Sequence, residues 1–564
     1  MPEPNPILVE SLSEELGIDE VLAFLLVQRG IRDFEQARTF FRPQLESLHN
    51  PFLMKDMDKA IQRIREAIDR QEKVLIYGDY DVDGTTSVAL IYSFFRERFS
   101  EIGYYIPDRY TEGYGISLPG INFAKEKGYS LIIALDCGIK AVEKIRYASS
   151  KGIDFIICDH HLPGDELPDA VAILDPKRPG CEYPYKELSG CGVGFKLLQA
   201  FCLRNGIPFS HIEAFLDLVA VSIASDLVPM TGENKILAYH GLKKMNRAPV
   251  PGLKALMNVS NLGDKLVTIS DVVFKIGPRI NAAGRISSGE SSVELLISNT
   301  CGEAQKLGEQ INDYNDHRKN IDGDITEKAL IMVEAQDKIK VRKTTVLFQP
   351  DWVMGVVGIV ASRLIEHYYR PTVVLTRSNG MATGSARSVD EYDVYNAINS
   401  CSDLLESFGG HKYAAGLSLP LENIEAFIER FEEYVSSTIT DDQLIPQILV
   451  DREILLSEIK PRFFRVLKQF EPFGPENLAP VFVSRKVYDT GKSRQVGRGW
   501  EHLKLSLTDG KTETNEIEAI AFNMGHLFNE IHKGNPFDLC FSIEENVFRG
   551  VASIQLMVRD IRFV

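Results

Sequence analysis

The sequence has no long hydrophobic run and no paired cysteines. Its apolar stretches stay well short of the ~20 residues that span a bilayer, and the residues after Met1 lack the basic and apolar regions of a signal peptide. The eight cysteines are scattered without a Cys-x-x-Cys pair, which argues against a zinc knuckle and a disulfide framework. We therefore expect a protein of the reducing cytoplasm with no membrane association.

The chain also lacks an excess of positive charge. Its 63 Lys and Arg stand against 79 Asp and Glu, which gives a formal net charge of −16. Non-specific nucleic-acid binding depends on pairing Lys and Arg with phosphates, so this balance argues against a protein that coats nucleic acid. It remains compatible with a channel that has a local basic lining. An acidic exterior with metals and a few arginines inside would suit a phosphate-processing enzyme.

The length of 564 residues predicts several domains, because it is too great for one hydrophobic core. We place the boundaries where the sequence pattern changes. The expected units are an N-terminal helical adaptor (1–50), an α/β domain (51–300), a connecting helix (301–341), a second, smaller α/β domain (342–444) and a β-barrel of the OB-fold type (445–564).

The first α/β domain is expected to hold a parallel sheet with helices on both faces. Apolar runs alternate there with helical stretches, which is the pattern of strand–helix–strand units. The expected strands are Val74–Tyr77, Gly103–Ile106, Leu131–Leu135, Phe155–Cys158 and Val171–Leu174. Ligands bind outside the carboxyl ends of such strands, so the residues that follow each strand are candidates for a site.

Acidic residues and histidines follow three of these strands and one later helix. They are Asp79, Asp81 and Asp83 after the first strand, Asp136 after the third, Asp159, His160 and His161 after the fourth, and Asp226 after a helix over about 215–224. Each group alone could be an acidic turn, a calcium loop or a polar cap. Together they predict a divalent-metal site, because close carboxylates repel one another unless a cation offsets them. Histidine favours manganese-type metals over calcium.

Three later segments leave alternatives open. Gly277–Arg285, between a β-like run and a helix, could contact phosphate through Arg279 or Arg285, or form a structural salt bridge. The glycines of Cys191–Gly194 resemble a phosphate loop, but no Lys-Ser/Thr follows, which favours close helix packing. Basic residues near Trp500 could track single strands or form an ordinary charged hairpin.

Four further expectations concern the second half of the chain. Residues 302–340 are too polar for a core helix and predict a solvent-bridging connector. Ser385 and Arg387 are expected in a loop, and Gly409–His411 in a glycine-rich turn. The first barrel strand is expected at Ile448–Val450.

The ordered motifs resemble those of the DHH phosphoesterase superfamily, and most closely its single-strand-specific 5′→3′ exonucleases. The motifs are Asp79–Gly84, Pro107–Arg109, Glu112–Gly115, Asp136–Gly138, Asp159–His161, Ser225-Asp226, Gly277–Arg285, Gly384–Ser388 and Gly409–His411. The resemblance covers nearly the whole chain. It implies a parallel-sheet DHH domain, a DHHA1-type second α/β domain and a C-terminal OB-fold.

The resemblance also implies a set of ligands for two Mn²⁺ or Mg²⁺ ions. The first ion would be held by Asp81, Asp83 and Asp136. Asp83 and Asp136 would bridge to the second, completed by His160 and Asp226. The resemblance implies that His161 polarises the substrate or supports the metal ligands without being a firm ligand itself. It makes Asp79 a possible ligand or water-orienting base.

Substrate contacts are implied on the facing domain. Ser385, Arg387 and Arg109 would pocket a terminal 5′-phosphate, with His411 near the scissile bond. The further candidates for substrate contact are Tyr114, Arg279, Asn281, Arg285 and Trp500.

The expected function is a single-stranded-DNA exonuclease of repair and recombination that releases 5′-mononucleotides from a free 5′ end. It would act as a monomer, with a RecQ-type helicase and a single-strand-binding protein as candidate partners. The alternatives are a DHH phosphodiesterase for short oligonucleotides or cyclic dinucleotides, and a non-catalytic scaffold. The presence of every expected ligand argues against the scaffold.

Overall fold

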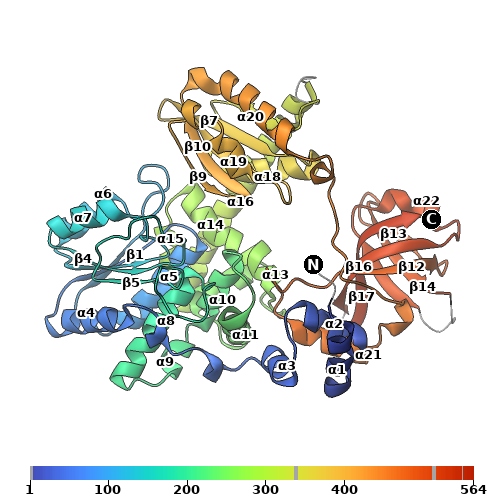
Figure 1. Cartoon of the computed structure of the whole chain (residues 1–564), viewed down its shortest axis with the longest axis horizontal. Helices are drawn as coiled ribbons and strands as arrows, with labels where there is room; N and C mark the ends of the chain where they lie inside the picture. The colour runs from blue at the N-terminus through green and yellow to red at the C-terminus, as the bar shows by residue number, and fades with distance from the viewer. Residues whose placement is uncertain (1–3, 336–340, 511–515, 549, 564) are drawn as a thin grey trace.

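Three β-sheets organise the chain, and Figure 1 shows them as three separate bodies. The computed structural model describes residues 4–335, 341–510, 516–548 and 550–563. A parallel-sheet body is followed by the long helix α16 (Cys301–Ala335), a second α/β body and a C-terminal barrel. None of the described helices combines the length and apolar character needed to cross a membrane.

The first sheet is entirely parallel, with the order β2-β1-β3-β4-β5. Its strands are β1 (Val74–Gly78), β2 (Ile102–Tyr105), β3 (Leu131–Leu135), β4 (Asp154–Cys158) and β5 (Ala172–Leu174). Alternate residues of β3 enter different cores, Leu131 and Ile133 on one face and Ile132 and Ala134 on the other. Burial on both faces explains why this strand is a continuous apolar run, and the predicted parallel sheet is confirmed.

Helices cover both faces of this sheet and build the rest of the body. They are α4 (Met57–Asp69), α5 (Val82–Phe95), α6 (Leu118–Lys127), α7 (Val142–Ser150), α8 (Gly190–Asn205), α9 (Ser210–Glu213), α10 (Leu216–Ser225), α11 (Gly232–Arg247), α12 (Pro251–Val259), α13 (Ile269–Asp271), the π-helix η3 (Val272–Ile276), α14 (Gly277–Ile286) and α15 (Glu290–Ile297).

The segment Gly277–Arg285 is a helix, which corrects the expected link between a β-like run and a helix. Its glycines suggest a break, but they serve close packing. A Cβ on Gly277 would lie 2.7 Å from Ser225 Oγ, and one on Gly284 would lie 2.9 Å from the carbonyl oxygen of Tyr80. The small residues therefore let α14 lie against α10 and the loop after β1.

The connecting helix α16 has a buried polar face, which corrects the expected solvent-bridging connector. Its Asp322 is fully buried and accepts a hydrogen bond from Arg318 at 2.8 Å. Arg363 of α18 (Val357–His367) forms an ion pair with the same carboxylate at 2.6 Å. The polar sequence thus reflects an internal ion network that joins α16 to the second α/β body. Residues 336–340 of the expected helix lie outside the described residues.

The second α/β body holds a mixed sheet with the order β6-β7-β8-β10-β9. Its elements are β6 (Thr345–Phe348), β7 (Thr372–Ser378), β8 (Met381–Arg387), β9 (Ser407–His411), β10 (Ala414–Leu419), α18, α19 (Val394–Asn399) and α20 (Ile424–Thr438). The expected loop at Ser385 and Arg387 is wrong, because both lie in β8. The expected turn at Gly409–His411 is also wrong, because it forms the edge strand β9. Pairing with neighbouring strands overrides the low strand propensity of these small residues.

The C-terminal body is a barrel closed by pairing between β12 and β14. Its elements are β11 (Arg452–Glu453), α21 (Pro461–Leu467), β12 (Phe482–Asp489), β13 (Arg494–Val496), β14 (His502–Thr508), β15 (Ile517–Ala521), α22 (Phe528–Ile531), β16 (Phe537–Phe548) and β17 (Val551–Phe563). The predicted β-barrel is confirmed, whereas Ile448–Val450 is not a strand.

The N-terminal helices belong to the same hydrophobic core as the barrel. They are α1 (Pro6–Leu16), α2 (Glu20–Gln28) and α3 (Phe34–Phe41). Buried Leu12, Leu25 and Ala37 share one apolar cluster with Phe463 and Phe537 of the C-terminal body. The two ends of the chain thus stabilise each other (Figure 1).

Candidate metal centre and active site

The loop after β1 presents Asp83 at the start of a buried helix. Asp83 is 1% exposed, and its carboxylate accepts hydrogen bonds from the backbone N–H groups of Gly190 (2.7 Å) and Cys191 (2.8 Å). Ser222 Oγ of α10 donates a third at 2.7 Å. Gly190 must lack a side chain, because a Cβ would lie 2.6 Å from Asp136 Cβ. The first turn of α8 therefore binds the carboxylate of Asp83 and not a phosphate. Gly190 is required there by close packing, as the sequence favoured.

Asp136 and His160 complete the centre of the site together with Asp226. Asp136 follows β3 with a left-handed backbone (φ 58°), and its N–H donates to the carbonyl of Cys158. His160 Nε2 lies 3.2 Å from Asp136 Oδ1, 3.5 Å from Asp226 Oδ2 and 3.7 Å from Asp83 Oδ2. Four segments distant in sequence thus bring three carboxylates around one imidazole.

The donor set fits a divalent cation. Asp136 Oδ1 and both ring nitrogens of His160 are buried without a hydrogen-bond partner. Burial, and then the charges of Asp83 and Asp81, raise the pKa of Asp136 well above its usual value. Burial, and then Asp83, raise the pKa of Asp226 to about 8. Such a cluster is unstable as a set of anions, and bound Mn²⁺ or Mg²⁺ would offset that repulsion.

The structure contains two sets of possible ligand atoms, and within each set the atoms lie within 4.8 Å of one another. One comprises Asp83, His160 and Asp226, and the other Asp136, His160 and His161. Burial lowers the pKa of His160, which favours the neutral imidazole that a metal requires. Asp81 caps α5 by accepting from the N–H of Gly84 at 3.0 Å. Four predicted ligands, Asp83, Asp136, His160 and Asp226, are therefore gathered at one edge of the sheet in two groups that share His160, whereas Asp81 belongs to neither group.

His161 is held by hydrogen bonds at both ring nitrogens. Its Nδ1 lies 2.7 Å from Asp159 Oδ1, and its Nε2 lies 3.1 Å from the hydroxyl of Tyr114. That hydroxyl donates to the carbonyl oxygen of Asp136 at 3.2 Å. Burial alone would lower the pKa of His161, but the bond to Asp159 raises it to about 9. Tyr114, which is expected to bind substrate, thus also fixes the orientation of His161.

Asp79 is fully buried, and only one of its two carboxylate oxygens accepts a hydrogen bond, which is long. Its Oδ1 accepts from the N–H of Gly115 at 3.4 Å, and its Oδ2 has no hydrogen-bond partner. Burial, and then Asp81, raise its pKa well above the usual value. Asp79 is therefore a buried carboxyl able to hold a proton.

At this edge the sequence reasoning missed Asp175 and did not find the individual role of Asp159. Asp159 is predicted only as a member of the acidic group, yet its Oδ2 accepts from the N–H of Ile139 (2.9 Å) while its Oδ1 anchors His161. Asp175 follows β5 as the other acids follow their strands, is fully buried and has an unpaired Oδ2. Burial raises the pKa of Asp175 to about 7. The same strand-end rule could have found it.

Three arginines converge where α14 meets the second α/β body. Arg285 donates to the carbonyl of Gly355 at 2.6 Å, and Arg387 donates to Ser385 Oγ at 2.8 Å. Burial, and then the positive charges of Arg109 and neighbouring arginines including Arg387, lower the pKa of Arg285 to about 10. Among the described residues none of the three forms an ion pair with a carboxylate within 4 Å. Neighbouring cations without a counter-ion favour binding of an anion.

This arginine group lies close to the loop after β1 that carries Asp79 and Asp81. The guanidinium of Arg109 stacks on the ring of Tyr80 at 4.0 Å, and its buried Nε has no hydrogen-bond partner. Tyr80 stands between Asp79 and Asp81 in the sequence, and the charges of both Arg109 and Arg285 act on its hydroxyl. The anion site and the carboxylates therefore share one tyrosine.

The remaining predicted residues are not gathered at this centre. Arg279 donates to Asn312 Oδ1 (3.0 Å) and to the carbonyl of Lys275 (2.8 Å), which favours a structural role over phosphate contact, although through neutral partners and not through the expected salt bridge. Asn281 has a buried, unpaired Oδ1. His411 is exposed on β9, and Trp500 is 63% exposed between β13 and β14.

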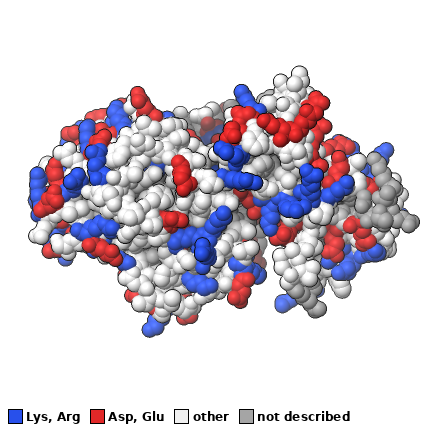
Figure 2. All heavy atoms as spheres, turned by 90° about the horizontal axis from the view of Figure 1, so that it is seen from below, with Lys and Arg blue, Asp and Glu red and all other residues white. Residues whose placement is uncertain are grey.

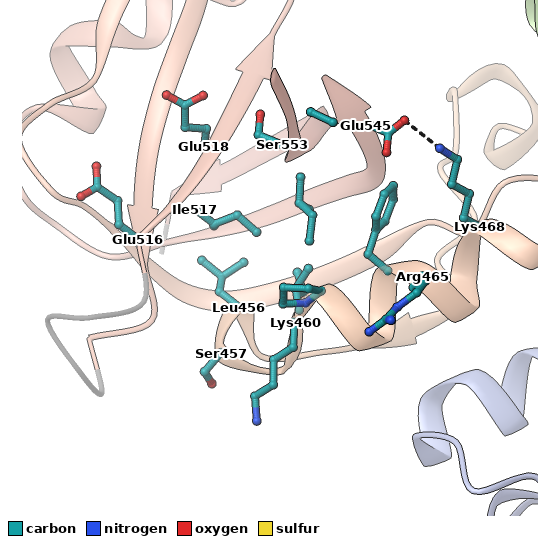
Figure 3. Close-up of a pocket in the computed structure, with 15 residues that line it drawn as sticks. Leu456, Ser457, Lys460, Arg465, Lys468, Glu516, Ile517, Glu518, Glu545 and Ser553 are labelled. Atoms are coloured by element: carbon teal, nitrogen blue, oxygen red, sulfur yellow. Dashed lines mark hydrogen bonds and ion pairs between the residues drawn. The ribbon is translucent and has the colours of Figure 1, made fainter. Parts of the chain in front are cut away.

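The barrel carries mixed charge rather than a basic patch. Arg485 pairs with Glu453 and Asp538, each at 3.0 Å, and Lys492 pairs with Glu516. Figure 2 likewise shows basic and acidic side chains interspersed over one face of the molecule. A hollow of about 720 Å³ on the barrel, between α21 and the start of β17, combines an apolar floor with the ion pair Lys468–Glu545 (Figure 3). It contains none of the predicted metal ligands.

Three family models match the chain in the order of its bodies. The DHH family N-terminal domain matches residues 73–223, the DHHA1 domain residues 336–437, and the RecJ OB domain residues 450–560.

Curated relatives and solved structures match over most of the chain. The single-stranded-DNA-specific exonuclease RecJ of Bacillus subtilis (strain 168) is 37% identical over 560 residues, covering 99% of this chain and 70% of that protein. RecJ of Salmonella typhimurium is 32% identical, covering 96% and 95%. RecJ of Thermus thermophilus in complex with Mn²⁺ superposes with a TM-score of 0.84 at 26% identity, covering 100% of this chain and 78% of that one. The same protein in complex with Mg²⁺ gives a TM-score of 0.78. The chain belongs to the RecJ family of single-stranded-DNA-specific exonucleases.

Proposed function

We propose that this protein is a divalent-metal-dependent exonuclease that degrades single-stranded DNA from a free 5′ end and releases 5′-mononucleotides. The observation that carries the proposal is the meeting of Asp83, Asp136 and Asp226 around His160, with buried ligand atoms that lack hydrogen-bond partners. Family membership adds the substrate class, and the crystal structures of the Thermus thermophilus relative with Mn²⁺ and with Mg²⁺ support these ions as cofactors.

Asp81, Asp83, Asp136, His160 and Asp226 would hold two ions. Such a pair neutralises charge on the transferring phosphoryl group and activates water. The hydrogen bonds from α8 and Ser222 keep the Asp83 carboxylate fixed for this purpose. Preorganised ligands avoid the cost of reordering the site when substrate arrives.

Two groups of the chain would handle protons and charge. The imidazole of His161, fixed between Asp159 and Tyr114, would place a positive charge beside the scissile phosphate. The free Oδ2 of Asp79 would accept a proton from the attacking water. His411 on β9 is proposed to approach the phosphate from the facing body.

The arginine group would define the end at which digestion starts. Arg109, Arg285 and Arg387, together with Ser385, would bind the terminal 5′-phosphate bidentately. Their position beside Tyr80 would seat the first phosphodiester at the metals, so cleavage would release one nucleotide at a time. A duplex end cannot enter if the direct contact between Arg285 and Gly355 keeps the two bodies close.

The cellular setting completes the proposal. We propose a cytoplasmic monomer that acts in repair and recombination on strands opened by a RecQ-type helicase and covered by a single-strand-binding protein. The eight free cysteines are consistent with a reducing compartment.

A digestion experiment with blocked ends tests this function. A single strand of about 20 nucleotides with a 5′-phosphate, long enough to reach beyond one OB-fold site, should be degraded in Mn²⁺. A strand blocked at its 5′ end should persist, and a 3′ block should have no effect. Asp136→Asn and His160→Ala should abolish digestion. Turnover of a dinucleotide as fast as a long strand would instead favour a short-oligonucleotide phosphodiesterase, which the matched RecJ OB domain already disfavours.

A further inference from the structure

An exposed phenylalanine stands in an unusual turn of helix. Phe274 is 75% exposed and lies at the middle of the π-helix η3. π-turns insert one extra residue into a helix and occur frequently at functional sites. Val272 and Ile276, two positions away on either side, are both fully buried. The chain thus anchors η3 at both ends while it turns an aromatic ring into solvent.

The element that carries Phe274 packs against the wall of the metal centre. η3 contacts α10, which ends at Ser225 and is followed by the predicted ligand Asp226. Gly277, the first residue after η3, approaches Ser225 so closely that an added Cβ would lie 2.7 Å from its Oγ. Figure 1 shows α13, directly before η3, on the side of the parallel-sheet body that is turned toward the barrel. A strand that extends from the metals toward the barrel would pass this side.

The surroundings of the ring suit one flat partner rather than a protein. Val273 is half-buried, and Lys275 is neutralised by an ion pair with Asp271 at 2.7 Å. One exposed aromatic side chain, between a half-buried valine and a paired lysine, is too small for a protein interface, which requires a contiguous apolar area. A nucleobase offers a π-face of the matching size, and stacking of this kind accepts any base.

We infer that Phe274 is a stacking platform for a base of the single strand held at the metal centre. The inference rests on the proposed function, because it requires a single-stranded nucleic acid as substrate. Phe274 touches the strand away from the reacting atoms and is therefore a binding residue, not a catalytic one. It would hold the strand between successive cleavages.

The test is a binding cycle in which either the ring or the bases are removed. The 5′-phosphorylated oligo-dT strand and an abasic strand of equal length are titrated by fluorescence anisotropy against the full-length protein in Ca²⁺, with digestion followed in Mn²⁺. Phe274→Ala should weaken binding of oligo-dT by about 5- to 100-fold, the effect of losing one stacked base. It should leave binding of the abasic strand unchanged. Phe274→Trp should retain affinity for oligo-dT, whereas Phe274→Leu should not.

Controls separate stacking from folding and from failure of the function itself. Phe34→Ala on α3 removes another exposed phenylalanine (42% exposed) and should leave both affinities unchanged. Mn²⁺ binding to Phe274→Ala, measured by calorimetry, should equal that of the unaltered protein. Equal losses on oligo-dT and abasic strands, or no loss on either, would overturn the inference. If the unaltered protein neither binds nor digests single strands, the proposed function fails instead.

Discussion

Ser222 offers a sharp test of how the metal centre is held together. Its side chain is fully buried on α10, and its hydroxyl donates to Asp83 Oδ1 at 2.7 Å while lying 2.6 Å from Ser189 Oγ. Ser222→Ala removes this donor and little volume. We predict that the variant folds and digests single strands at a near-normal rate, but only at a higher Mn²⁺ concentration.

The expected size of the effect follows from the other contacts of Asp83. A hydrogen bond to a charged group contributes about 1.5–3 kcal/mol. If all of this energy were lost from metal binding, the affinity for Mn²⁺ would fall by about 10- to 100-fold. The N–H groups of Gly190 and Cys191 continue to hold the carboxylate. We therefore expect the lower end, about a tenfold rise in the Mn²⁺ concentration for half-maximal rate.

The assay pairs the initial rate of strand digestion across a Mn²⁺ titration with calorimetric Mn²⁺ binding in the absence of DNA. The matched control is Ser292→Ala, since Ser292 is equally buried but donates to the backbone carbonyl of Ile280 at 2.9 Å. That variant should lose stability without any change in Mn²⁺ requirement. The reasoning is refuted if Ser222→Ala needs no more Mn²⁺ than the unaltered protein, or if both variants shift equally.

Three further predictions concern charge. Asp136→Asn should abolish activity. It should also raise the thermal midpoint of the metal-free protein by about 2–4 °C, roughly the effect of 1 kcal/mol, because it removes a buried like charge. A lower midpoint in scanning calorimetry would contradict this. Arg387→Ala should lower the preference for a 5′-phosphorylated over a 5′-hydroxyl strand by about tenfold, and an unchanged ratio of kcat/KM would exclude its role. Burial lowers the pKa of Lys235 to about 7. The unfolded chain therefore binds an extra proton between about pH 7 and 10.5, and the unfolding free energy of the natural protein should rise relative to Lys235→Met across that window. The prediction is contradicted if urea denaturation gives a difference in unfolding free energy between the two proteins that does not change with pH.

The ligands at the sheet edge could be predicted because one geometric rule connects them to the sequence. Parallel strands end at the same edge, so residues after β1, β3 and β4 must come together whatever the loops do. The same rule covers Asp175 after β5, which a stricter reading would have included. No sequence rule locates Ser222. It lies inside an apolar helix, and only the packing of α10 against α5 and α8 brings it to Asp83.

The second α/β body was harder to predict because its functional segments are rich in small residues. Gly384 suggests a strand breaker, yet a Cβ there would lie only 1.9 Å from the carbonyl oxygen of Val374. The glycine is needed for strand β8 to pack against β7. The position of Arg387 depends on that pairing, and local propensity cannot reveal it. The shared core of the N-terminal helices and the barrel is likewise a long-range contact with no local signal.

The two candidate sites of opposite charge explain why the net charge of −16 is a poor guide to this protein. Burial and neighbouring carboxylates raise the pKa values of Asp136 and Asp226 beside His160. Burial lowers the pKa values of Arg285 and Arg387, and the neighbouring arginines lower that of Arg285 further. Each cluster is therefore destabilising alone. Bound metal ions would supply the missing cations to one cluster, and a phosphate of the substrate would supply the missing anion to the other; Tyr80 is in contact with Arg109 and feels the charges of Asp79 and Asp81. Substrate and metal should thus bind cooperatively, because each removes a repulsion that the fold maintains in their absence.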